Sequence, residues 1–194
     1  MSEGPSIREL MQGVRAGDHA AAAEMVRRYE AALRQAVRAR LRDARLRRLF
    51  DSADVCQSVF ASFFVRAALG QYEVDHPEQL VRLLQAMARN KVVNRVERER
   101  AGQRDYRRTA AGDVREVAAA APGPTPSWVA ANRELLEDAR RRLSPEERHL
   151  LELREDGRGW AEIAAELGGS PQALRKRLER AVERVADELG LGAE

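Results

Sequence analysis

Hydrophobic side chains recur every three or four residues through the first hundred positions, which is the spacing of one face of an α-helix. From Ala20 to about Arg48 the recurring positions are Met25, Tyr29, Leu33, Val37 and Leu41. A second stretch, DSADVCQSVFASFFVRA (residues 51–67), begins with the candidate N-caps Asp51 and Ser52. Its hydrophobic stripe consists of Val55, Val59, Phe60, Phe63 and Phe64. The phenylalanines of this stripe are interpreted as core residues.

A third helix is predicted from DHPEQLVRLLQAMARNKVVNRVERER (residues 75–100). Pro77 suits the first helical position, where the missing N–H group is not needed. The helix should continue past Asn94 with a basic surface. Between the second and third helices, LGQYEVDH (residues 69–76) contains a glycine, a tyrosine and two acids and is predicted to be a loop.

The last third of the chain predicts short, closely spaced helices. One should run from Trp128 to Leu143. The next should begin after Ser144, with Glu147 three residues later completing a capping box, and should end near Asp156 and Gly157.

GWAEIAAELGGSPQALRKRLERA (residues 159–181) predicts two helices joined by a tight turn at Gly168 and Gly169. The faces expected to be buried are Trp160, Ile163, Ala164 and Leu167 in the first helix and Leu174, Leu178, Ala181, Val182 and Val185 in the second. The side chains expected to point away are Gln172, Lys176, Glu179 and Arg180, with Arg175, Arg177 and Arg184 on the flanks. This pattern is typical of a DNA-binding helix-turn-helix, although an ordinary corner of two helices with a solvated basic face has the same spacing.

The segment between these helical parts, TAAGDVREVAAAAPGPTPS (residues 109–127), is rich in alanine, glycine and proline and poor in large apolar side chains. Such a composition buries too little surface to offset the entropy of ordering it, so a flexible linker is predicted. Its 19 residues can extend to roughly 60 Å. Strand patterns are almost absent. We therefore expect an all-α fold with two helical domains, residues 1–108 and 128–194, joined by the linker.

Positive charge is concentrated in three windows. The formal net charge of the chain is only +3, yet residues 34–48 carry +6, residues 89–108 carry +5 and residues 175–184 carry +3. Clusters of this kind favour a polyanionic partner over a merely soluble surface.

Other features exclude several classes of protein. The single cysteine, Cys56, rules out an internal disulfide framework and fits a reducing compartment. No signal segment or long apolar run is found, so we expect a cytoplasmic protein without membrane insertion. His19, His76 and His149 lie far apart, and no metal-ligand spacing, glycine-rich phosphate loop or nucleophile elbow is present. We expect no enzyme activity, no metal and no cofactor.

The order of these segments resembles the sigma factors of bacterial RNA polymerase, in particular the extracytoplasmic-function (ECF) group. LSPEERHLLELREDGRGWAEIAAELGGSPQALRKRLERAVERVADEL (residues 143–189) resembles sigma domain four. RAGDHAAAAEMVRRYEAAL (residues 15–33) and the two helical segments that follow it resemble sigma domain two. The chain departs from the common family pattern at Leu83, Asn94 and Gly169.

The resemblance implies three sets of site residues. Contacts to core RNA polymerase are implied for Asp54, Gln57 and Ser58. Recognition of the minus-ten promoter element is implied for Tyr72, Arg89, Asn90, Lys91, Asn94, Arg95 and Arg98. Recognition of the minus-thirty-five element is implied for Gln172, Arg175, Lys176, Arg177 and Arg180. Packing on its own domain explains a lone loop tyrosine such as Tyr72 equally well. An ordinary solvated surface is the alternative interpretation of the charged helix faces.

The expected function is that of an ECF-type sigma factor, which directs core RNA polymerase to specific promoters and initiates transcription. Core polymerase and promoter DNA are the implied partners. An anti-sigma factor is a further candidate partner, because many members of this group are held by one. Two alternatives stay open on the sequence: a stand-alone helix-turn-helix regulator, whose operator would be palindromic, and a helical adaptor whose basic faces bind acidic proteins.

Overall fold

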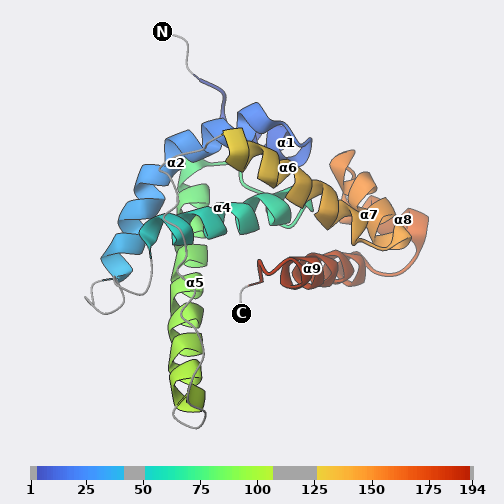
Figure 1. Ribbon diagram of the computed structural model, residues 1–194. Helices are drawn as coiled ribbons and strands as arrows, with labels where there is room; N and C mark the ends of the chain where they lie inside the picture. Colours follow the sequence, from blue (N-terminus) through green and yellow to red (C-terminus); the bar gives the residue numbers. More distant parts are fainter. Residues whose placement is uncertain (1–3, 42–50, 107–125, 193–194) are drawn as a thin grey trace.

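Helices account for all the regular secondary structure of the described chain. The computed structural model describes residues 4–41, 51–106 and 126–192, without the side chains of residues 98–132. Within these ranges no strand is present, which confirms the all-α class. In chain order the helices are α1 (Ile7–Arg15), α2 (His19–Arg40), α4 (Ser52–Ala68), α5 (Pro77–Tyr106), α6 (Pro126–Arg141), α7 (Pro145–Glu155), α8 (Trp160–Leu167) and α9 (Pro171–Glu188) (Figure 1).

Most helix starts follow the capping signals in the sequence. The Asp51 carboxylate accepts a hydrogen bond from the backbone N–H of Ala53 at 2.8 Å and opens α4. Ser144 and Glu147 form the predicted capping box at the start of α7. Pro77 is the first residue of α5, as predicted. Side-chain caps satisfy N–H groups that have no partner inside the helix, so they fix where each helix begins.

Some boundaries differ from the sequence prediction. Helix α1 was not predicted, although Ser6 and Glu9 form a capping box whose spacing was readable in the sequence. Helix α2 ends at Arg40, and residues 42–50 lie outside the described residues. The prediction of a linker at residues 109–127 also falls on undescribed residues, except that α6 already begins at Pro126.

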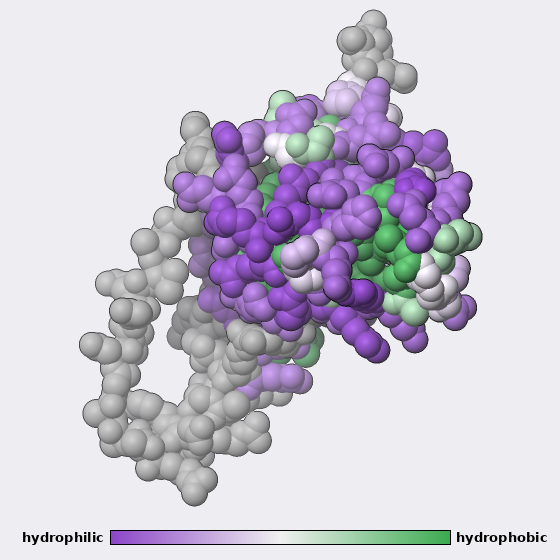
Figure 2. Space-filling view, turned by 90° about the vertical axis from the view of Figure 1, so that its right-hand side faces the viewer, coloured by the Kyte–Doolittle hydropathy of each residue, from purple (hydrophilic) through white to green (hydrophobic). Residues whose placement is uncertain are grey.

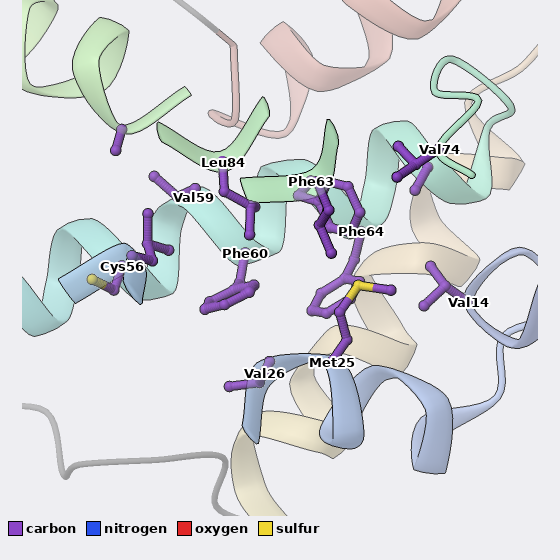
Figure 3. Close-up of a cluster of buried hydrophobic side chains, with 14 of the residues drawn as sticks. Val14, Met25, Val26, Cys56, Val59, Phe60, Phe63, Phe64, Val74 and Leu84 are labelled. Carbon is purple, nitrogen blue, oxygen red and sulfur yellow. The ribbon is translucent and has the colours of Figure 1, made fainter. Parts of the chain in front are cut away.

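The N-terminal core lies where α1, α2, α4 and α5 meet (Figure 3). Phe60, Phe63 and Phe64 are at most 2% exposed, which confirms that they belong to the core. The ring of Phe63 lies edge-on to Phe64 with centroids 5.4 Å apart. Cys56 is buried beside them, and this burial raises the pKa of its thiol to about 11. The thiol is therefore protonated and unreactive at neutral pH.

A second buried cluster joins α6, α7, α8 and α9. It includes two residues from the end of α4, Val65 and Leu69, which are both fully buried. Helix α4 therefore contributes one side to the N-terminal core and another side to the C-terminal helices. In Figure 1 the C-terminal helices accordingly lie against α4.

Neither a membrane-spanning helix nor a metal-binding cluster is found in the described ranges. None of the helices there is long and apolar enough to cross a bilayer. No three ligand-type side chains (His, Cys, Asp or Glu) come together there as a metal site would require.

We expect the folded state to lose stability in acid through Glu24 on α2. Arg27 and Arg28 donate hydrogen bonds to its carboxylate at 2.6 and 2.5 Å, and these bonds lower the pKa of Glu24 from 4.5 to about 2. A depressed folded-state pKa stabilises the protein above the unfolded value, and this contribution is lost as the pH falls from about 4.5 toward 2. The urea concentration at the unfolding midpoint should therefore change less between about pH 7 and about pH 3 for Glu24→Gln than for the parent chain. An equal difference in both proteins would contradict this assignment.

Candidate nucleic-acid interface

Helices α8 and α9 form the predicted helix-turn-helix. Gly168 and Gly169 in the turn adopt φ values of 78° and 90°, in the left-handed region that favours glycine. Ser170 caps α9 by accepting a hydrogen bond from the N–H of Ala173 at 3.1 Å, and Pro171 is the first helical residue. The glycine pair reverses the chain, and the cap starts α9 at the predicted residue.

A buried seam fixes the position of α9. Ile163 and Ala164 from α8 are buried, as predicted. The buried residues of α9 are Leu178, Ala181, Val182, Val185 and Ala186. Leu167 is 41% exposed, so the prediction that it is buried is wrong. It is the last residue of α8, and periodicity alone does not reveal whether a neighbour faces the end of a helix.

The opposite side of α9 carries the side chains predicted to meet DNA. All five predicted residues there are exposed: Gln172, Arg175, Lys176, Arg177 and Arg180. Arg175 pairs with Glu179 at 2.9 Å, and Arg177 pairs with Glu146 on α7. Lys176 and Arg180 form no ion pair with any residue that the structure describes. The side of the molecule formed by α7 to α9 is mostly hydrophilic (Figure 2).

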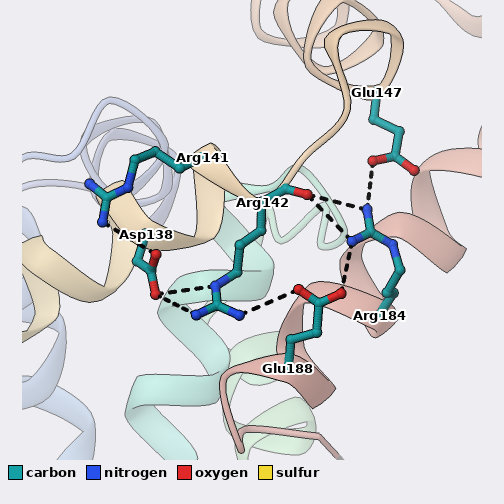
Figure 4. Close-up of polar contacts among 6 residues, drawn as sticks. All are labelled: Asp138, Arg141, Arg142, Glu147, Arg184 and Glu188. Carbon is teal, nitrogen blue, oxygen red and sulfur yellow. Dashed lines mark hydrogen bonds and ion pairs between the residues drawn. The ribbon is translucent and has the colours of Figure 1, made fainter.

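A network of ion pairs holds α9 against α6 and the start of α7 (Figure 4). Arg184 pairs with Glu147 at 2.7 Å and with Glu188 at 3.0 Å. Arg142 pairs with Asp138 at 3.0 Å and with Glu188 at 3.4 Å. Hydrogen bonds donated by Arg142 and Arg184 lower the pKa of Asp138 and of Glu188, respectively. The network positions α9, and it keeps these carboxylates ionised beside the exposed cations.

An open hollow of about 610 Å³ lies beside this network. Its lining consists of Glu147, Ala173, Arg177, Arg180, Ala181 and Arg184. Arg177 pairs with Glu146, and Arg184 pairs with Glu147 and Glu188, whereas Arg180 forms no ion pair with a described residue. Phosphate oxygens are favourable ligands for an exposed guanidinium group such as that of Arg180.

The residues predicted to recognise the minus-ten element lie mainly on α5. Lys91 and Asn94 are half-buried, whereas Arg89, Asn90 and Arg95 are exposed. In a regular helix Arg89 lies about 200° around the axis from Lys91, so α5 does not bring these two side chains to one face. Lys91 donates a hydrogen bond to the backbone oxygen of Leu191 at 3.5 Å. Arg98 lies on α5, and its side chain is outside the described residues.

Tyr72, in the loop before α5, is packed within its own domain. Its ring stacks on Phe63 with centroids 5.9 Å apart and planes 8° apart. Its hydroxyl donates to the sulfur of Met87 at 3.9 Å, and burial raises the pKa of the phenol. The packed position is one of the two alternatives that the sequence left open.

The predicted polymerase-binding residues lie on the N-terminal half of α4. Gln57 is exposed, and Asp54 and Ser58 are half-buried. At 100° per residue, Asp54 and Ser58 lie on the side of α4 that faces away from Phe60 and Phe63.

Sequence reasoning missed the residues that join the C-terminal helices to the rest of the chain. They are Val65 on α4, Leu69 directly after it, Glu73 in the loop before α5, Arg154 on α7 and Leu191 after α9. A signal for the first two was present, because Val65 and Leu69 form an i, i+4 apolar pair on the side of α4 away from its phenylalanines. A helix that is apolar on two sides requires two partners.

The comparison with protein families agrees with this arrangement. Residues 5–190 match the ECF sigma factor family, which covers every helix described above. A comparison with curated proteins finds no match. Because the match spans nearly the whole chain and includes the helix-turn-helix, this chain belongs to the ECF sigma factor family of transcription initiation factors.

Proposed function

We propose that this chain directs core RNA polymerase to promoters that carry two separated recognition elements. The observation that carries the proposal is the outer side of α9, where Lys176 and Arg180 are exposed and form no ion pair in the described part of the chain. Exposed cations on the second helix of a helix-turn-helix are suited to contact base edges in the major groove.

Helix α9 is proposed to recognise the minus-thirty-five element. Arg175, Lys176 and Arg180 can donate to the N7 and O6 acceptors of guanine, and the amide of Gln172 can pair with adenine. Arg177 lines the hollow beside the ion-pair network and is proposed to bind the phosphate backbone, which sets the register of the helix on the duplex.

Helix α5 is proposed to recognise the minus-ten element. The proposed residues are Arg89, Asn90, Lys91, Asn94, Arg95 and Arg98. Tyr72 is not among them, because its ring is stacked on Phe63 within its own domain. The amides of Asn90 and Asn94 can pair with base edges, and the cations can bind the backbone of a separated strand.

Helix α4 is proposed to bind core polymerase through Asp54, Gln57 and Ser58. Attachment to one large partner would tether both DNA-binding helices, so the second contact would form at a high effective concentration. Each DNA contact could then be weak by itself, and tight promoter binding would require the polymerase.

A reconstitution with sigma-free core polymerase tests the proposed function. We expect a stable complex that initiates transcription from a subset of a promoter library. The free chain should bind the same fragments weakly and lose affinity steeply with salt, because much of that affinity comes from phosphate contacts.

Other outcomes would favour other functions. Tight, sequence-specific binding of the free chain to a palindromic site, without a polymerase complex, would favour a stand-alone regulator. Binding to an acidic protein with no DNA preference would favour an adaptor. Capture of the chain by an anti-sigma factor would be compatible with the proposal and would add a partner.

A further inference from the structure

Two of the cations on the outer side of α9 are paired with acids of this chain. Arg175 pairs with Glu179, one turn along the same helix, at 2.9 Å. Arg177 pairs with Glu146, which lies in the first turn of α7. The second pair differs from the first because its acid belongs to another helix. Glu146 therefore holds a DNA-facing side chain of α9 from outside that helix.

The start of α7 does not depend on Glu146 for its cap. The next residue, Glu147, accepts a hydrogen bond from the backbone N–H of Ser144 at 2.9 Å and pairs with Arg184 at 2.7 Å. The side chain of Glu147 is only 16% exposed, whereas that of Glu146 is 74% exposed. Among the described residues, Glu146 forms an ion pair with Arg177 and with no other side chain.

Glu146 offers Arg177 the same ligand chemistry as a DNA phosphate. A carboxylate and a phosphate both present anionic oxygens to the planar fork of a guanidinium group. Arg177 also lines the hollow beside the ion-pair network, together with Arg180, where a phosphate would be bound. If Glu146 kept its place during DNA binding, its negative charge would lie close to that phosphate and repel it. The two anions therefore compete for Arg177.

The exposure of this pair sets the size of the effect. The side chains of Arg177 and Glu146 are 49% and 74% exposed, and ion pairs between exposed side chains are weak. DNA can therefore displace the carboxylate, at a cost of about three- to fivefold in affinity. The cost is the same for every DNA sequence, because phosphate contacts carry no sequence information.

We propose that Glu146 competes with the DNA backbone: its carboxylate holds Arg177 in the free chain, and Arg177 exchanges this carboxylate for a phosphate when α9 enters the duplex. The inference rests on the proposed function, since it requires α9 to bind duplex DNA. Glu146 then lowers the affinity for all DNA. It thereby shortens the time spent on non-promoter DNA, which is bound through its phosphates.

Glu146→Gln tests the proposal in the full-length chain, because glutamine keeps the size of the side chain and removes its charge. We expect the variant to bind duplex DNA about three- to fivefold more tightly than the parent chain at low salt. The gain should be equal for a duplex with a matched minus-thirty-five element and for a scrambled one. Fluorescence anisotropy of labelled duplexes gives both dissociation constants. Equal affinity of the variant and the parent would overturn the proposal.

A double-mutant cycle with Arg177→Ala distinguishes competition for Arg177 from simple repulsion of DNA by Glu146. Without Arg177 the carboxylate has no cation to withhold, so adding Glu146→Gln should leave the affinity within about 1.5-fold. A gain as large as in the parent background would mean that Glu146 acts on DNA directly, and it would overturn the proposal.

Glu137→Gln is the matched control. Glu137 pairs with Arg133 one turn away on α6, and its side chain is 54% exposed. The substitution removes the same charge and also leaves an arginine without its acid, but on a helix that is not proposed to bind DNA. We expect unchanged affinity for both duplexes. A gain equal to that of Glu146→Gln would show that the loss of any exposed acid strengthens DNA binding, and the proposal would fail.

Failure of this proposal can be distinguished from failure of the proposed function. If the parent chain binds core polymerase and both duplexes but Glu146→Gln brings no gain, only the competition at Arg177 is wrong. If the parent chain binds neither core polymerase nor duplex DNA at low salt, the proposed function is wrong and the competition fails with it.

Discussion

Replacing Phe63 with alanine should lower the free energy of unfolding by about 3–5 kcal/mol, the usual cost of removing a buried phenylalanine ring. Phe63 is fully buried at the centre of α4, edge-on to Phe64 and stacked on Tyr72. The substitution would leave a cavity where α4 meets the loop before α5. A loss of this size is a large fraction of the stability of an ordinary domain. Urea unfolding followed by circular dichroism measures it.

Gln57→Ala is the control for this experiment. Gln57 lies on the same helix but is exposed, so the change should stay within about 0.5 kcal/mol. A loss below about 1 kcal/mol for Phe63→Ala would mean that the core collapses around the missing ring. In that case the three phenylalanines would not form the close-packed centre described here.

Replacing Lys176 and Arg180 together with alanine should abolish selection of promoters by their minus-thirty-five element. Each lost base contact is expected to cost about 1–3 kcal/mol, so the pair should weaken discrimination by about 2–6 kcal/mol. Both side chains are exposed and form no ion pair with described residues, so the fold should tolerate the change. Discrimination is measured as the ratio of transcription by reconstituted holoenzyme on promoters with a matched minus-thirty-five sequence to that on promoters with a scrambled one.

A control variant that removes two other cations distinguishes base recognition from the general effect of positive charge on DNA binding. Arg133 and Arg141 are exposed arginines on α6, away from the outer side of α9. Their replacement by alanine should leave the ratio between matched and scrambled promoters unchanged. If the double variant at Lys176 and Arg180 kept the parent ratio, α9 would not read bases through these residues, although it could still bind phosphates.

Local signals in the sequence predicted most individual helices. The capping box at Ser144, the proline that begins α5 and the glycines before α9 act within a few residues, so their effect is readable without the fold. The same reasoning failed at Leu167, because the end of a helix is buried only if another element covers it.

The exposed side chains of α9 were also readable from the sequence. A helix of known period has a buried seam and an opposite side, so Lys176 and Arg180 had to point outward once Leu178 and Val182 were placed in the core. The side chains predicted on α5 were only partly brought together. The sequence indicated a basic helix, but the structure places Lys91 against the backbone of Leu191, a hundred residues later in the chain.

The helical class, the core side of each amphipathic helix and the cations that α9 presents could be derived from the sequence, because these depend on the order of side chains along one helix. The packing of α4 against two cores and the stacking of Tyr72 on Phe63 became apparent from the tertiary structure. The same is true of the ion pair between Glu73 and Arg154 and of the hydrogen bond from Lys91 to Leu191. Such pairings depend on which surfaces fit together when distant segments are brought into contact, and no periodicity along the chain specifies that fit.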